Sequence, residues 1–184
     1  METYQLVAKL GDVVTQVNRL LALANDYRGN IYPRRLEFGG YLTILDEKTG
    51  KILLILACGI IPPENAKKWL EFSQEQAFRL LSHENHKTSY ESRDEEYGWY
   101  AGSVRGTEGI YSFYGHYSDV NEAIATSVFY LVEPGCHGCK KFNGKELFNY
   151  YYVGVSERNR YIRPFLDSTK HWVGNIYMDS FFPR

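Results

Sequence analysis

The strongest candidate for chemistry is a histidine that follows an aromatic run near the middle of the chain. His116 comes after a predicted strand holding Tyr111, Phe113 and Tyr114, and Gly115 separates it from that strand. It precedes a predicted helix, where unpaired backbone N–H groups favour an anionic group. Its imidazole could bind a haem iron or contact a propionate while the aromatic rings cover the ligand. A surface loop histidine is the alternative interpretation, because single histidines occur in loops for many reasons.

A second pair of histidines, His83 and His86, is three residues apart. One metal ion could reach both side chains if a helix continued through them. The next residues, Lys87-Thr88-Ser89, are typical of a loop and favour a structural or solvated role. We keep both histidines as candidate ligand-binding residues.

The third candidate is the segment Cys136-His137-Gly138-Cys139, which resembles one knuckle of a zinc site. It is not a c-type haem attachment site, because Lys140 stands where that motif needs histidine. A structural zinc needs two more ligands, and Cys58 and His171 are poorly placed candidates. Cys136 and Cys139 could therefore share a zinc ion across a dimer, form a thiol–disulfide pair, or belong to an inert turn.

Charge and motif content argue against several functional classes. The 184 residues include 21 Lys and Arg and 22 Asp and Glu, with a net charge of −1. This balance gives no broad positive field, so we expect no nucleic-acid partner. The sequence holds no glycine-rich phosphate loop, His-Glu-x-x-His pair or Gly-x-Ser-x-Gly elbow. These observations favour a protein that is not an enzyme.

The sequence also predicts a cytoplasmic protein with no membrane partner. Its longest apolar run, Ile52–Cys58, is too short to span a bilayer, and residues 1–5 lack the basic start of a signal peptide. Three cysteines do not form the even-numbered framework of a small secreted fold, so a reducing compartment suits them better.

Periodicity predicts the first half of the fold. Apolar residues recur every three or four positions over residues 3–28, which indicates an amphipathic helix. Phe38–Asp46 is strand-like, and Ile52–Cys58 is apolar without alternation, as in a central strand covered on both faces. Residues 64–81 predict the next helix.

The middle of the chain predicts a hairpin that leads into a capped helix. After a polar loop over residues 83–96, Trp99–Arg105 and Ile110–Tyr114 flank a glycine-bounded turn. Asp119 and Glu122 then fit a capping box, with Asp119 as the N-cap.

We expect an α+β domain over residues 1–134, in which one antiparallel sheet packs against helices with profilin-like layering. The predicted order is helix, hairpin, helix, hairpin, helix. Residues 135–184 predict a Tyr-rich β extension packed on the same domain, with strand-like runs at Leu147–Val155 and Trp172–Met178 and a turn at Glu157–Arg160.

Two segments resemble the haem-degrading-domain superfamily of GlcG-like and HbpS-like proteins. Asn85–Tyr90 is similar to a Gly-His-Ser-Ser turn of one branch, and Gly102–Ile124 is similar to the family's hairpin, loop and helix. The resemblance implies the element order given above and a protein that binds haem or another tetrapyrrole-type ligand. The chain differs at Phe113-Tyr114-Gly115, where family members commonly have Val-Ser-Gly, and at Asn121-Glu122, in place of an acidic pair.

Two functional hypotheses follow. The first is a non-catalytic small-ligand-binding protein, with haem or a related tetrapyrrole as the ligand. The second is a structural or interaction protein of the same fold that forms a homo-oligomer or binds a partner through its Tyr-rich C-terminal extension. Convergence of His116, His83 and the strand Tyr111–Tyr114 on one site favours the first hypothesis, and divergence favours the second.

Overall fold

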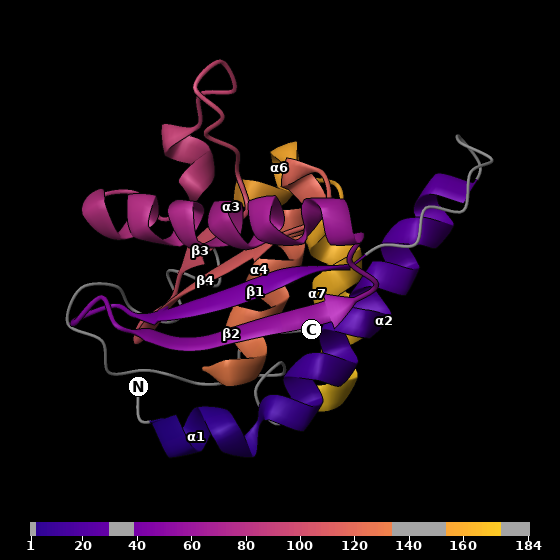
Figure 1. Cartoon of the computed structure of the whole chain (residues 1–184). Coiled ribbons are helices and arrows are strands. Elements are labelled where there is room, and N and C mark those ends of the chain that lie inside the picture. The colour runs from indigo at the N-terminus through magenta and orange to yellow at the C-terminus, as the bar shows by residue number, and fades with distance from the viewer. Residues whose placement is uncertain (1–2, 30–38, 134–153, 174–184) are drawn as a thin grey trace.

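The computed structural model describes residues 3–29, 39–133 and 154–173. Its centre is a four-stranded antiparallel sheet in the order β2-β1-β4-β3 (Figure 1). The strands are β1 (Gly39–Asp46), β2 (Ile52–Gly59), β3 (Ser103–Arg105) and β4 (Gly109–Tyr114). The helices are α1 (Thr3–Ala8), α2 (Leu10–Gly29), α3 (Pro63–Ser82), the 3-10 helix η1 (Ser89–Ser92), α4 (Ser118–Val132), α6 (Ser156–Arg158) and α7 (Ile162–Val173). The predicted α+β class is confirmed.

Helices cover both faces of the sheet, with α3 on one face and α4 on the other (Figure 1). Alternation along the strands decides which side chain meets which helix. Leu42 and Ile44 of β1 join the larger core with α2, α4 and α7. Leu45 of β1 and Ile110 of β4 instead pack with Ala77 and Leu80 of α3 in a smaller cluster.

The strand predicted to be central, Ile52–Cys58, lies at the sheet edge as β2, so that prediction is wrong. β1 takes the central place because it pairs with β2 on one side and β4 on the other. Leu54 and Leu56 pack against the larger core, whereas Ile52 and Ile55 are 44% and 40% exposed. A continuous apolar run therefore marks an edge strand here.

The helix predicted over residues 3–28 is two helices, α1 and α2, which meet at Lys9. The Lys9 ammonium donates hydrogen bonds to the carbonyl oxygens of Leu131, at 3.3 Å, and Val132, at 2.7 Å. A cation there complements the C-terminal end of the α4 dipole. Burial lowers the pKa of Lys9, against the opposing effect of the Glu133 charge.

The predicted C-terminal β extension is helical over its described part, residues 154–173. Residues predicted as a turn at 157–160 include the end of α6, and Trp172 and Val173, predicted to open a strand, end α7. Ile162, Phe165 and Leu166 of α7 are buried in the larger core. The rest of both predicted strands, and Cys136 with Cys139, lies outside the described residues.

Candidate functional site

A loop between η1 and β3 projects beyond α3, at the top of Figure 1. We call residues Asp94–Trp99 the aromatic loop. Its two ends form an isolated antiparallel bridge, in which Asp94 N donates to Trp99 O at 2.9 Å and Trp99 N donates to Asp94 O at 2.7 Å. The Asp94 carboxylate also accepts the N–H groups of Glu96 and Tyr97. Gly98 supplies the positive φ of 74° that the turn requires.

Two aromatic side chains extend from this loop into solvent. Tyr97 is 76% exposed and Trp99 is 42% exposed. Their ring centroids are 5.9 Å apart, so the two rings contact each other. The loop therefore presents an aromatic pair on a hydrogen-bonded turn.

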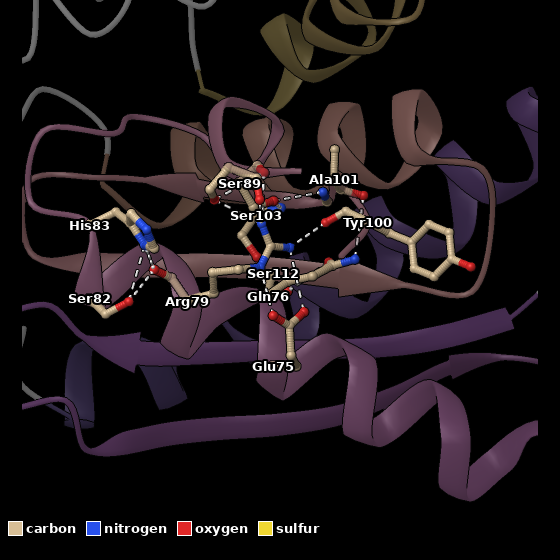
Figure 2. Close-up of polar contacts among 12 residues, drawn as sticks. Glu75, Gln76, Arg79, Ser82, His83, Ser89, Tyr100, Ala101, Ser103 and Ser112 are labelled. Atoms are coloured by element: carbon tan, nitrogen blue, oxygen red, sulfur yellow. Dashed lines mark hydrogen bonds and ion pairs between the residues drawn. The ribbon is translucent and has the colours of Figure 1, made fainter. Parts of the chain in front are cut away.

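A buried arginine, Arg79 of α3, fastens the chain on both sides of the aromatic loop (Figure 2). Its Nη1 donates to the carbonyl oxygens of Ser89 and Ser92 at 3.0 and 2.9 Å, and to the Ser92 hydroxyl at 2.8 Å. Its Nη2 donates to Tyr100 O at 2.6 Å. Glu75, one turn earlier on α3, neutralises the guanidinium through a 2.6 Å contact to Nε. These bonds hold η1 and Tyr100 on α3.

The stem of the loop carries a second set of polar contacts (Figure 2). The Ser89 hydroxyl accepts the N–H groups of Gly102 and Ser103 at 3.0 and 2.9 Å. Gln76 of α3 donates to Ala101 O at 3.5 Å. Backbone atoms on both sides of the aromatic loop are therefore tied to buried side chains, which limits how the loop can move.

A second buried arginine, Arg105 of β3, holds the segment that follows α3. It donates to the carbonyl oxygens of Leu80, of His83 at 3.1 Å and of His86 at 2.9 Å. Glu47 supplies the counter-charge at 2.6 Å. A cation that binds the last carbonyls of a helix is favoured by the helix dipole.

The predicted pair His83 and His86 lies at this end of α3. The two rings stack with their centroids 4.8 Å apart. Nδ1 of His83 is 2.7 Å from the Arg79 carbonyl oxygen, which gives that ring a structural contact. In the described parts of the chain, no group of three or more His, Cys, Asp or Glu residues could hold a metal ion. Burial raises the pKa of the Cys58 thiol to about 12, so this thiol stays protonated.

His116 and Gly115 form the link between β4 and α4. Asn121 brackets this link: its Oδ1 accepts His116 N at 2.9 Å, and its Nδ2 donates to His116 O at 2.7 Å. Nδ1 of His116 accepts the Tyr117 N–H at 2.8 Å. A Cβ on Gly115 would lie 2.1 Å from Gly39 O, so only glycine fits there. The backbone turn between β4 and α4 therefore explains why Gly115 and Asn121 occupy these positions.

The three aromatic residues of β4 do not converge on one site with His116. Tyr111 and Phe113 are buried toward α4, and the Tyr111 hydroxyl donates to Glu133 at 2.7 Å. Tyr114 lies on the α3 face, with ring centroids 4.9 Å from Phe72 and 6.0 Å from Tyr100. Alternation of side chains along a strand causes this separation. Desolvation, with a smaller effect of Tyr100, raises the pKa of Tyr114 to about 12.

The capping box predicted at Asp119 and Glu122 is absent. The N-cap of α4 is Tyr117, which makes no side-chain capping bond. Glu122 is instead fully buried. Both of its oxygens accept from Arg158 of α6, at 2.7 and 2.8 Å, and Asn159 donates at 3.0 Å. A buried carboxylate needs such a cation, and this pair fastens α6 to α4.

A second buried carboxylate, that of Glu133, holds the C-terminal end of α4. The Glu133 carboxylate accepts the backbone N–H groups of Thr107, Glu108 and Gly109, which form the turn between β3 and β4. The hydroxyls of Thr107 and Tyr111 donate to the same carboxylate. Successive N–H groups in a turn make a concave site for an anion. Glu133 occupies that site within the chain.

The sequence did not indicate Arg79, which positions the aromatic loop, or Arg105, which positions the segment that follows α3. Their partners are mainly backbone carbonyl oxygens, which have no residue-type signature. The available signal for Arg79 is its position two residues after Ala77 and one before Leu80, both fully buried residues of α3. A charged residue that close to an inner helical face must be paired.

No family model, curated protein or solved structure matches this chain. Within the described residues, no helix combines the length and apolar character needed to cross a membrane.

Proposed function

We propose that the chain is a non-catalytic interaction protein that binds a partner through the aromatic loop. The observation that carries this proposal is the pairing of exposed Tyr97 and Trp99 with the buried Arg79 network beneath them. Tryptophan and tyrosine dominate the binding energy of many protein interfaces. A loop ordered before binding loses less entropy when its partner arrives.

The energetics of Arg79 support a role beyond packing. Its guanidinium is buried, and it forms contacts to Glu75, Ser89, Ser92 and Tyr100. Burying a charge costs free energy unless it is paired and hydrogen-bonded, and hydrophobic residues can often replace such a pair without loss of stability. The network is therefore better explained by the loop conformation that it specifies.

Capture experiments with matched variants test this function. Trp99→Ala and Phe78→Ala each remove one aromatic side chain that is 42% exposed. Phe78 lies on α3, outside the aromatic loop. The wild-type protein is immobilised and incubated with an extract of the cells that express it. The proteins that it retains should be lost with Trp99→Ala and kept with Phe78→Ala. Equal capture by all three forms would contradict a role for the loop.

A small planar ligand, with haem as the first candidate, is the second proposed function. Phe72, Tyr100 and Tyr114 come from three segments and meet as half-buried rings. The Lys68 ammonium lies 5.6 Å from the Phe72 ring centroid, where it could meet an anionic ligand group. The element order α2-β1-β2-α3-β3-β4-α4 is the order expected for the haem-degrading-domain superfamily and for profilin-like layering. It therefore supports this second function.

Hemin titration distinguishes this second function. A shifted Soret band that weakens in Tyr114→Ala would support ligand binding at the ring cluster, and one that weakens in His116→Ala would support binding at the strand exit. The absence of a shift at micromolar hemin would remove the haem version.

Self-association is a further part of the proposal, and β2 supports it. The strand is eight residues long and uncharged, and among the described residues it is an edge strand of the sheet, with Ile52 and Ile55 exposed. Natural edge strands usually carry charges or other features that prevent pairing. Light scattering should give a dimer for the full chain and a monomer for Ile55→Lys. A monomeric wild type across micromolar concentrations would contradict this part.

A further inference from the structure

We propose that the aromatic loop binds a cationic segment of a partner protein, and that arginine side chains supply the cation. This inference rests on the proposed interaction function and names the chemistry of the partner. It is carried by the charges that surround Tyr97 and Trp99.

The loop places carboxylates beside its aromatic pair. Glu95 and Glu96 are exposed and directly precede Tyr97 in the turn. No ion pair of either side chain occurs within the described residues. The Asp94 carboxylate is used inside the turn, because it accepts two backbone N–H groups. Two outward carboxylates therefore accompany the two exposed rings.

Arg93 is the cationic residue nearest in sequence to Glu95 and Glu96, and its guanidinium is directed toward Tyr90. Arg93 places its guanidinium carbon 3.8 Å from the ring centroid of Tyr90. Arg158 lies 3.7 Å from the same centroid, so Tyr90 contacts two guanidinium groups. Arg79 lies 5.8 Å from the Trp99 centroid, but its hydrogen bonds join it to the buried network. The outward carboxylates of Glu95 and Glu96 are therefore available to a cation of another molecule.

Arginine suits this surface better than lysine. A guanidinium can stack on an aromatic ring and also donate two parallel hydrogen bonds to a carboxylate. The surface presents both kinds of group within one turn, at Tyr97 and Trp99 and at Glu95 and Glu96. A lysine ammonium can meet the same groups only as a point charge.

Defined peptides test the inference without knowledge of the natural partner. The probes are capped hexapeptides of alternating glycine and arginine, or of alternating glycine and lysine. Calorimetry with the full chain should give an arginine-peptide affinity at least about threefold above that of the lysine peptide. The double variant Glu95→Gln/Glu96→Gln and the single variant Trp99→Ala should each weaken arginine-peptide binding about fivefold or more.

Tyr117→Ala is the matched control, because Tyr117 is a 58% exposed aromatic residue outside the aromatic loop. It should leave peptide affinity unchanged. Arginine binding that survives Trp99→Ala, or equal affinity for the two peptides, would overturn the inference. The proposed function is separable from it: if Trp99→Ala abolishes capture of a natural partner while no arginine peptide binds, the loop is an interface and the cation assignment is wrong.

Discussion

Nη2 of Arg79 donates to the carbonyl oxygen of Tyr100 at 2.6 Å, across 21 positions of the chain. This bond joins the inner side of α3 to the residue that directly follows the aromatic loop. The same guanidinium binds Ser89 and Ser92 before the loop. One buried side chain therefore sets the separation of the two stems that present Tyr97 and Trp99.

Arg79→Ala should lower the free energy of unfolding by about 3–5 kcal/mol, because it leaves buried acceptors and Glu75 without their cation. Arg79→Lys should recover only part of this loss, since an ammonium cannot make the same fork of bonds. Urea unfolding measures both. Lys67→Ala, in the exposed pair Lys67–Glu71 of the same helix, is the control and should cost less than about 0.5 kcal/mol. A similar small cost for Arg79→Ala would refute the structural role of the network.

Arg158→Met should destabilise the fold by about 3 kcal/mol or more, because Glu122 is then a buried carboxylate without its cation. The double variant Glu122→Met/Arg158→Met removes both charges and should restore at least about 1 kcal/mol of that loss. Chemical unfolding of the two variants gives the comparison. A double variant no more stable than Arg158→Met would contradict the cost assigned to the unpaired Glu122 carboxylate.

Glu133→Gln should cost about 2–3 kcal/mol, because the amide group removes one acceptor from the N–H groups and hydroxyls around it. Glu108→Gln is the matched control in the same turn. Glu108 pairs with Lys48 at 3.8 Å near the surface, so its replacement should cost less than about 1 kcal/mol. Equal losses in thermal or urea unfolding would mean that the turn does not depend on the Glu133 carboxylate.

Tyr114 should make the protein less stable in alkali. Its pKa is raised from 10.0 to about 12, so between these pH values the unfolded chain loses the phenolic proton while the native state keeps it. The contribution is complete below about pH 10 and falls as pH rises toward 12. Wild type should therefore lose more stability than Tyr114→Phe across this window, and their difference should be constant below about pH 9. Parallel pH curves up to pH 12 would contradict the burial of the hydroxyl.

Short sequence patterns predicted the elements whose conformation depends mainly on residues close in sequence. The turn between β3 and β4 and the helix α3 follow from glycine placement and from Pro63 at the helix start. The edge position of β2 depends on which strands pair with β1, and a run such as Ile52–Cys58 carries no information on that choice. The helix α7 was mistaken in part for strand, although Ile162, Phe165 and Leu166 have the i, i+3, i+4 spacing of a buried helical face.

The site was less predictable, because its contacts join distant residues through backbone atoms. Glu122 has the spacing of a capping residue, yet Arg158, 36 positions away, decides its role. Tyr111 and Tyr114 are close in sequence but lie on opposite faces of β4. The predicted strand starts at Trp99, whereas β3 starts at Ser103, so that prediction is wrong for residues 99–102. The Asp94–Trp99 bridge and the contacts of Arg79, which show that Tyr97 and Trp99 lie on an ordered loop, depend on the folded structure.

The most direct test of the interaction function is site-specific photo-crosslinking in the cells that express the protein. A photoreactive phenylalanine analogue replaces Tyr97 in one form and Phe78 in a control form, and cross-linked products are identified by mass spectrometry. The account predicts a defined partner protein cross-linked from position 97 and not from position 78. Cross-links from position 97 that match those from position 78, or none at all, would contradict it.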